Sequence, residues 1–214
     1  MIIYYDWNRS PNCLKTKILL NELGIEYAQC DVEQSDLRGA DYRQKFPTGQ
    51  APAIEDGELR LCESQAIGMY LAEKHGALLP KAPHRRALMF QALSLESSLL
   101  APTVGGAGLF GELYKPEGER NAARIAELRV KAHWVGQVLG ATLGEREWFA
   151  EELSIADIQL YAATSKSLEN GAFGDAPKNL VAWCARMTAR PSVASARELN
   201  VHYRRAPARG ATAA

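Results

Sequence analysis

The segment RSPNCLK, residues 9–15, gathers several reactive groups around one proline near the start of the chain. It contains a hydroxyl at Ser10, a carboxamide at Asn12 and a thiol at Cys13, and a helical pattern follows. The unpaired N–H groups and the dipole at a helix N-terminus stabilise a negative charge. The segment is therefore a candidate site, and the question is which of these groups, if any, does chemistry.

A proline at an unusual place marks a second segment, PTGQAPAIEDG, residues 47–57. Pro52 lies just before an expected strand, where a proline removes a hydrogen-bond donor from the sheet. It either opens the strand in the ordinary way or follows a cis Ala51–Pro52 bond, a form taken by only about 5–6% of X-Pro bonds. A cis turn would leave the N–H and C=O of Ala51 free to pair with an extended, peptide-like ligand.

The first part of the chain alternates strand and helix patterns, in the order β-α-β, connection, β-β-α. A strand at 2–5 precedes a helix that Gly24 ends, and a second strand follows at 25–32. Residues 33–45 form a loop or a short helix, and Asp56-Gly57 turns a hairpin. The next helix starts in CESQAI, with Ser64 as its N-cap.

The rest of the chain has only helical periodicity, which predicts a separate all-helical domain. A first helix is expected around residues 88–99, ended or kinked by Pro102, and a second over 117–143. A third begins at Ser154, which forms a capping box with Asp157, and a fourth covers 179–189. The predicted domains are 1–76, a linker at 77–84, a helical domain at 85–203 and a flexible tail at 204–214.

Composition limits the function classes. Lys+Arg and Asp+Glu number 25 each, so the net charge of zero gives no field that would attract nucleic acid. We find no secretory signal and no apolar run long enough to span a membrane, and the cysteines form no zinc pattern with the histidines. We expect a cytoplasmic protein without a metal, and cysteines that are mostly core residues. The cysteines are Cys13, Cys30, Cys62 and Cys184.

The order of these elements resembles that of the cytosolic glutathione transferases over nearly the whole chain. The motifs that carry the resemblance are SPNCLK, GQAPAIEDG, CESQAI, and LSIADI with ARPSV. The resemblance implies an α/β thioredoxin-like N-terminal domain with a mixed four-stranded sheet, followed by an all-α C-terminal domain. It also implies glutathione as co-substrate, a homodimer and a role in detoxification.

The resemblance implies that glutathione lies along the Ala51–Pro52 turn, with its γ-glutamyl end held by Glu63 and Ser64. An acidic side chain can pair with the ligand's ammonium, and a helix start can receive its carboxylate. Capping alone would explain Ser64 but not Glu63. Gln50 is expected at the other end of the tripeptide, where Lys15 or Lys45 could assist.

The chemical task that the resemblance implies is to keep the sulfur of glutathione ionised. Lowering a thiol pKa of about 8.5 by two units requires about 2.7 kcal/mol. One hydrogen bond to the charged sulfur contributes about 1.5–3 kcal/mol, and a helix N-terminus about 0.3–1 kcal/mol. One hydroxyl therefore suffices, and Ser10 matches the catalytic hydroxyl of theta-like and zeta-like transferases.

Asn12 makes the segment Ser-Pro-Asn, which resembles the Thr-Pro-Asn of the nu class, where the amide also orients the sulfur. The zeta class has Ser-Ser-Cys-Ser here, which argues against its isomerase activity. Three alternatives remain open. Ser10 could be only the N-cap of its helix, Cys13 could either pack in the core or form a mixed disulfide with glutathione, and Tyr5 could be the catalytic hydroxyl or a core residue.

The electrophile is expected between the two domains, beside GGAGLFGELY, whose glycines would make an adjustable apolar wall. Ordinary helix packing would explain the same aromatic residues. The pocket residues named by this hypothesis are Trp7, Leu109, Phe110 and Tyr114. The leading prediction is a glutathione S-transferase that conjugates glutathione to an apolar electrophile. Its alternatives are a glutathione-dependent disulfide reductase or peroxidase and a non-catalytic binding or regulatory protein.

Overall fold

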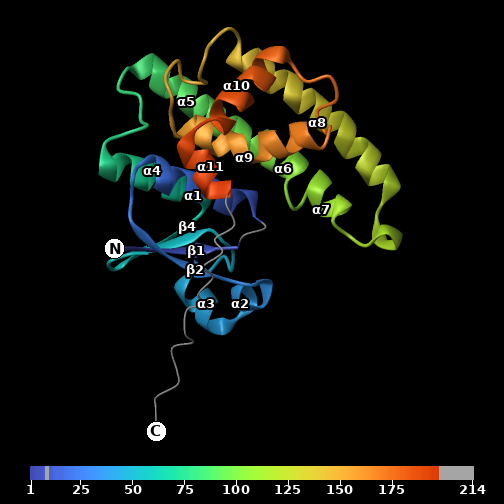
Figure 1. Cartoon of the computed structure of the whole chain (residues 1–214). Helices are drawn as coiled ribbons and strands as arrows, with labels where there is room; N and C mark the ends of the chain where they lie inside the picture. Colours follow the sequence, from blue (N-terminus) through green and yellow to red (C-terminus); the bar gives the residue numbers. More distant parts are fainter. Residues whose placement is uncertain (8–9, 198–214) are drawn as a thin grey trace.

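The computed structural model describes residues 1–7 and 10–197. Its N-terminal region is a sheet with two helices on each face (Figure 1). The β-α-β, connection, β-β-α order predicted from the sequence is confirmed. The elements are β1 (Ile2–Asp6), α1 (Pro11–Glu22), β2 (Tyr27–Asp31), α2 (Gln34–Arg38), α3 (Ala40–Lys45), β3 (Ala53–Asp56), β4 (Leu59–Cys62) and α4 (Ser64–His75).

The sheet has the strand order β2-β1-β3-β4. β1 runs parallel to β2 and antiparallel to β3, and β3 pairs antiparallel with β4. The hairpin turns at Gly57, whose φ of 62° is favourable for glycine, as the Asp56-Gly57 signal predicted. This is the mixed four-stranded sheet of a thioredoxin-like domain. β2 is shorter than expected, and the 33–45 segment forms two short helices instead of one.

Alternate residues of β1 point to opposite faces of the sheet. Tyr4 belongs to the core beneath α1 and α4, whereas Tyr5 packs against Tyr42 and Phe46 from the side of α2 and α3. The two faces are therefore separate cores with different neighbours.

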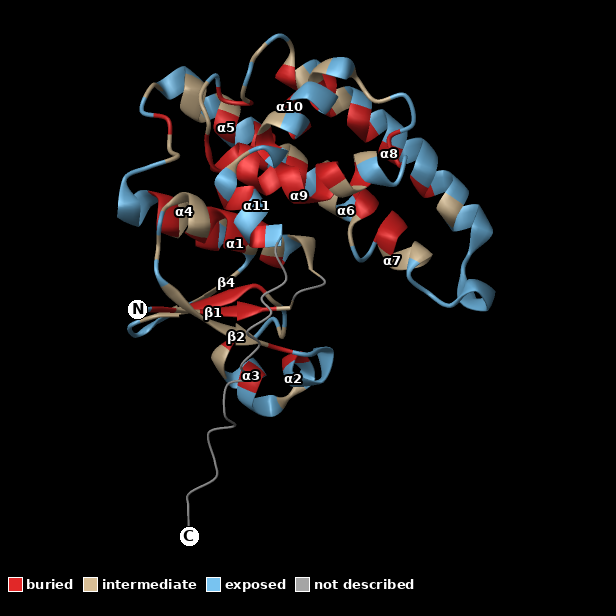
Figure 2. Ribbon diagram, in the orientation of Figure 1, coloured by how far each residue is buried: buried red, intermediate tan, exposed pale blue. Residues whose placement is uncertain are grey.

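The C-terminal region is helical, and its central helix is buried along most of its length (Figure 2). That helix, α9, begins with the predicted capping box between Ser154 and Asp157, and Asp157 also accepts from the indole of Trp183 at 3.0 Å. The elements are α5 (Pro83–Leu95), the π-helical turn η1 (Glu96–Leu100), α6 (Ala101–Val104), α7 (Leu109–Leu113), the 3-10 turn η2 (Glu117–Glu119), α8 (Ala122–Leu143), α9 (Ile155–Glu169), α10 (Lys178–Thr188) and α11 (Pro191–Arg197).

The helical region differs from the sequence prediction in several places. The helix expected to end or kink at Pro102 passes through the π turn η1 and the proline, and ends at Val104. α8 starts five residues later than expected, where Asn121 caps it by accepting from the N–H of Arg124 at 3.0 Å. α11 was not predicted, although Pro191 is a typical first-turn residue.

The two regions pack on each other through helices: α1 contacts α9 and α11, and α4 contacts α9. Between them, α4 ends at Gly76 in a left-handed conformation and α5 begins at Pro83. The boundaries at 76 and 84 stay a proposal, and the tail predicted at 204–214 lies outside the described residues. By length and composition alone one helical stretch, Pro83–Leu113, could cross a membrane, which is weak evidence because core helices pass the same test.

Candidate functional site

Ser10 is the N-cap of α1. Its Oγ accepts from the N–H of Cys13 at 3.4 Å, and its own N–H donates to the carbonyl of Trp7 at 2.8 Å. Pro11 then occupies the first helical position. A hydroxyl accepts and donates at once, and the Ser10 side chain also forms a hydrogen bond with the Cys13 thiol, which partly opposes the rise in the pKa of that thiol. Capping and donation to an anion are therefore compatible.

Asn12 lies two residues after Ser10 and has an exposed side chain. Its Oδ1 accepts from the ammonium of Lys15 at 2.9 Å. The carboxamide NH2 has no acceptor among the described residues, so it is a second available donor at the start of α1.

Cys13 faces the core instead. Its side chain is 1% exposed, and its Sγ accepts from the N–H of Trp7 at 3.4 Å. Burial, with a smaller contribution from the carboxylate of Asp6, raises the pKa of the thiol to about 12. A thiol that is neutral and buried at pH 7 is a poor nucleophile, which favours the packing role over the mixed disulfide.

Tyr5 lies on the sheet face that α2 and α3 cover. Its hydroxyl donates to the carboxylate of Glu55 and accepts from the ammonium of Lys45 at 3.1 Å. Burial raises the pKa of this hydroxyl, and the bond to Glu55 raises it further. Lys45 also binds Glu55, at 2.7 Å. These contacts occupy both the Tyr5 hydroxyl and the Lys45 ammonium.

The Ala51–Pro52 bond is cis, which confirms the less ordinary of the two interpretations. Pro52 is buried, and the N–H and C=O of Ala51 have no protein partner within the described part of the chain. Gln50 has an exposed side chain, while its carbonyl accepts from the hydroxyl of Tyr42 at 2.9 Å. Sequence reasoning missed Tyr42, which holds this turn from α3.

Gly49, also missed, is required by this turn. Its φ is 60°, and a Cβ there would come within 2.9 Å of the carbonyl oxygen of Leu37. The glycine before Gln50 in the PTGQAP segment was the available signal.

The start of α4 differs from the sequence expectation. Glu63, not Ser64, is the N-cap, and Ser64 is the first helical residue. Glu63 has a φ of 71°, a conformation that costs a residue other than glycine about 1–3 kcal/mol and that clusters at binding sites. Its carboxylate is exposed and has no ion pair among the residues described. The first N–H groups of α4 are likewise open, since Ile67 is the first whose N–H bonds back, to the carbonyl of Glu63 at 2.9 Å.

The sheet brings these three segments together. Tyr5 of β1 pairs with Ala53 of β3, which pairs with Cys62 of β4, so these residues form one row at one end of the sheet. α1 follows β1 beyond this row, the cis turn precedes β3, and α4 follows β4. Three neighbouring strands span about 10 Å, which is also the length of about three extended residues. The end of the sheet is therefore sized for a tripeptide.

Comparison with known proteins fits this geometry. Residues 1–73 match the glutathione S-transferase N-terminal domain. A zeta-class glutathione S-transferase of Euphorbia esula is 34% identical over 121 residues, which are 53% of this chain and 53% of that protein. A glutathione S-transferase of Hyoscyamus muticus is 29% identical over 205 residues, 88% of this chain and 94% of the other.

Among solved structures, a glutathione transferase of Pseudomonas putida with glutathione disulfide bound superposes with a TM-score of 0.82 at 27% identity. The superposition covers 93% of this chain and 91% of the Pseudomonas putida chain. The family match covers residues 1–73, and the structural similarity extends over both the N-terminal and the helical region. The thioredoxin-like and helical regions have the arrangement of glutathione transferase structures.

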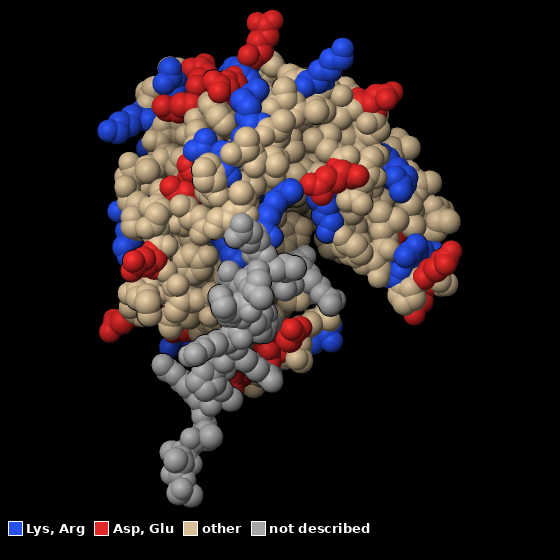
Figure 3. All heavy atoms as spheres, viewed as in Figure 1, with Lys and Arg blue, Asp and Glu red and all other residues tan. Residues whose placement is uncertain are grey.

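The residues expected to line an electrophile pocket differ in exposure. Leu109 and Phe110 pack into the core, whereas Tyr114 is 66% exposed. Tyr114 stacks on Phe110. The ammonium of Lys166 lies over both rings, 4.6 Å from the centroid of Tyr114 and 5.1 Å from that of Phe110. Trp7 is half-buried and contacts both cores of the sheet. Figure 3 shows the molecule deeply indented between the lobe that carries α7 and the sheet region.

Two glycines at α7, Gly108 and Gly111, lie close to the backbone of the preceding segment. A Cβ on Gly111 would come within 1.7 Å of the carbonyl oxygen of Gly106, and one on Gly108 within 2.2 Å of that of Thr103. Glycine is therefore needed at Gly108 and Gly111 for close backbone approach.

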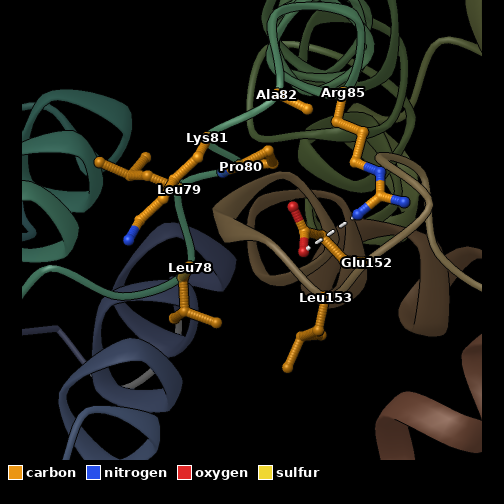
Figure 4. Close-up of a pocket in the computed structure, with 8 residues that line it drawn as sticks. All are labelled: Leu78, Leu79, Pro80, Lys81, Ala82, Arg85, Glu152 and Leu153. Carbon is orange, nitrogen blue, oxygen red and sulfur yellow. Dashed lines mark ion pairs between the residues drawn. The ribbon is translucent and has the colours of Figure 1, made fainter.

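A surface pocket of about 370 Å³ lies elsewhere, between the 78–82 segment and the residues before α9 (Figure 4). Leu78, Pro80 and Leu153 line it, and Arg85 pairs there with Glu152 at 3.6 Å. No candidate site residue lines this pocket. Within residues 1–7 and 10–197, no group of three or more His, Cys, Asp or Glu side chains is placed to hold a metal ion.

Proposed function

We propose that this protein is a glutathione transferase: it binds reduced glutathione, keeps the sulfur ionised and directs it at an apolar electrophile. The observation that carries the proposal is the convergence of the α1 start, the cis turn and the α4 start at one end of the sheet. The match of residues 1–73 and the similarity to glutathione transferases over both regions give independent support.

In this proposal the tripeptide lies across the end of β1, β3 and β4. The free N–H and C=O of Ala51 pair with its main chain, as in an added strand. The unpaired carboxylate of Glu63 binds the ligand's ammonium, and the open N–H groups at Ser64 receive its α-carboxylate. Gln50 contacts the glycyl end. Lys45 is engaged with Glu55 and contributes less than the sequence suggested.

The sulfur then lies at the start of α1. Ser10 donates its O–H and Asn12 its free NH2 to the thiolate. Hydrogen bonds to a charged group contribute about 1.5–3 kcal/mol each, and about 2.7 kcal/mol suffices for a shift of two pKa units. The conjugation forms a bond from sulfur to the electrophile, which in a substitution expels its leaving group. No metal takes part in this step.

Ultraviolet titration of glutathione bound to the native protein tests the proposal. We expect thiolate absorbance with an apparent sulfur pKa below that of free glutathione. Ser10→Ala and Asn12→Ala raise this pKa, and Cys13→Ala leaves it unchanged because that thiol is buried and neutral. Absence of both glutathione affinity and thiolate absorbance in the native protein would instead favour a non-catalytic binding or regulatory protein, in which Ser10→Ala changes nothing.

A glutathione-dependent disulfide reductase or peroxidase is the second candidate. Two observations favour it: the Ser-Pro-Asn segment at 10–12 and the similarity to a Pseudomonas putida structure that holds glutathione disulfide. Turnover of a mixed disulfide of glutathione, compared with turnover of an aromatic halide, separates the two. The preferred substrate, a homodimeric assembly and a cytoplasmic location belong to the same proposal.

A further inference from the structure

A chain of buried polar groups lies behind Asn12. Lys15 is 1% exposed and Glu96 is 3% exposed, and the two form an ion pair between α1 and η1. Gln65 of α4 donates to the other carboxylate oxygen of Glu96 at 2.8 Å and to the carbonyl of Leu93 at 2.9 Å. Asn12 accepts from Lys15 at 2.9 Å. The chain therefore joins the starts of α1 and α4 to the helical region.

Packing alone does not account for these residues. A buried ammonium is costly without a paired carboxylate, and apolar residues of similar volume would usually fill such a site at least as stably. Burial lowers the pKa of Lys15, while the carboxylate of Glu96 opposes this effect. Ion pairs of this kind have their best-attested use in fixing a position or a register.

Here the ion pair fixes the orientation of the Asn12 carboxamide. An ammonium has three donors and no acceptor, so Lys15 can bind only the oxygen of Asn12. Holding the oxygen against Lys15 leaves the NH2 group facing away from the ammonium. A reversed amide would present an oxygen to the thiolate and repel it. Lys15 thus decides whether Asn12 is a donor.

The π turn is an independent indication that this contact is functional. η1 begins at Glu96, and single π turns inside α-helices occur frequently at functional sites. Gln65 directly follows Ser64, so the same carboxylate also contacts the helix start expected to hold the γ-glutamyl end.

We propose that Lys15 is a positioning residue: held by Glu96 and Gln65, it orients Asn12 so that the carboxamide NH2 donates to the thiolate of bound glutathione. This inference rests on the proposed function. It adds a residue that does not touch the ligand and a link from the helical region to the reacting sulfur.

A double-mutant cycle on the sulfur pKa of bound glutathione tests it. We expect Lys15→Met to lower the thiolate fraction at pH 7 about three- to tenfold, as Asn12→Ala does. Combining the two adds nothing further, because each removes the same donor. Lys15→Met combined with Ser10→Ala is additive, since Ser10 acts independently.

Two further variants serve as controls for effects on folding. Lys15→Met/Glu96→Leu leaves no unpaired buried charge, so it folds even where Lys15→Met does not, and it shows the same loss of thiolate. Lys17→Met removes another buried lysine of α1 that does not contact Asn12, and it leaves the sulfur pKa unchanged. Circular dichroism and thermal melts establish that each variant is folded.

A native sulfur pKa in the folded Lys15→Met/Glu96→Leu protein would overturn the inference, and so would additivity between Lys15→Met and Asn12→Ala. Either result leaves the proposed function intact, provided that the native protein binds glutathione as a thiolate. Absence of that thiolate in the native protein overturns both.

Discussion

The starts of α1 and α4, at the same end of the sheet, offer different groups to a charged ligand. α1 has a side-chain cap at Ser10 and a carboxamide anchored to a buried ion pair. α4 has no side-chain cap hydrogen bond, and its cap residue, Glu63, is exposed and has a φ of 71°. The first arrangement offers fixed donors to one charged atom. The second keeps main-chain N–H groups and a carboxylate open for a zwitterion in solvent.

This difference predicts different kinetic signatures. Groups that stabilise charge on the reacting sulfur act on its pKa and on turnover, whereas groups that hold the remote end of the tripeptide act mainly on its binding. Substitutions at α1 and at α4 therefore separate into two classes, and each prediction below either sharpens or breaks that separation.

The largest effect is expected at Ser10. Ser10→Ala removes a hydrogen bond to a charged sulfur, so kcat/KM for glutathione at pH 7 falls about 10- to 100-fold, corresponding to about 1.5–3 kcal/mol. Ser10→Thr is the matched control, since it keeps the hydroxyl and its capping ability and retains most of the activity. Equal loss in both variants would mean that the hydroxyl is not the donor. Steady-state kinetics over pH 6–9 measures both.

Glu63 is expected to give the next effect. Glu63→Gln removes the charge opposite the ligand's ammonium and raises KM for glutathione about tenfold, close to 1.4 kcal/mol, while the sulfur pKa stays native. A rise in the sulfur pKa of this variant would show that the two helix starts are not separate in function. Isothermal titration of glutathione and ultraviolet titration of its sulfur measure the two quantities on the same protein.

Local signals made much of this arrangement predictable. The element order, the hairpin at Gly57 and the capping box of α9 follow from turn chemistry and periodicity that short segments carry, whereas the cis bond before Pro52 was one of two interpretations that the sequence left open. The Lys15–Glu96 pair joins residues 81 apart, and no local pattern reports such a contact. The φ of Glu63 was equally hidden, because glutamate normally avoids that conformation.

A third prediction concerns the core beneath α1 and the pH dependence of the free energy of unfolding. The pKa of Cys13 is raised to about 12, so above pH about 9 the unfolded thiol ionises while the folded one stays neutral. The stabilisation is complete below pH 9 and is lost between pH 9 and 12, at about 1.4 kcal/mol per pH unit. Denaturant unfolding at pH 8, 9 and 10 measures this slope.

The control for this slope is Cys13→Ala. The variant starts from a lower stability because it leaves a small cavity, but its stability falls less steeply above pH 9. Cys30 and Cys62, which are only half-buried, remain in both proteins and cancel in the comparison. Equal slopes in the native protein and the variant would show that the Cys13 thiol ionises in the folded state, and would reopen its role as a nucleophile.

The smallest expected effect is on the free energy of unfolding, and it has opposite signs at the starts of α4 and α1. Glycine adopts a φ near 71° without the steric cost that glutamate bears there, so Glu63→Gly raises the free energy of unfolding by about 1 kcal/mol. It weakens glutathione binding at least as much as Glu63→Gln does. At α1 the opposite holds, because Ser10→Ala removes an N-cap and lowers stability by about 1 kcal/mol together with activity. Urea unfolding of both variants beside Glu63→Gln measures these differences. A loss of stability in Glu63→Gly would mean that the glutamate side chain supports the fold, and that its backbone conformation is not kept for the ligand.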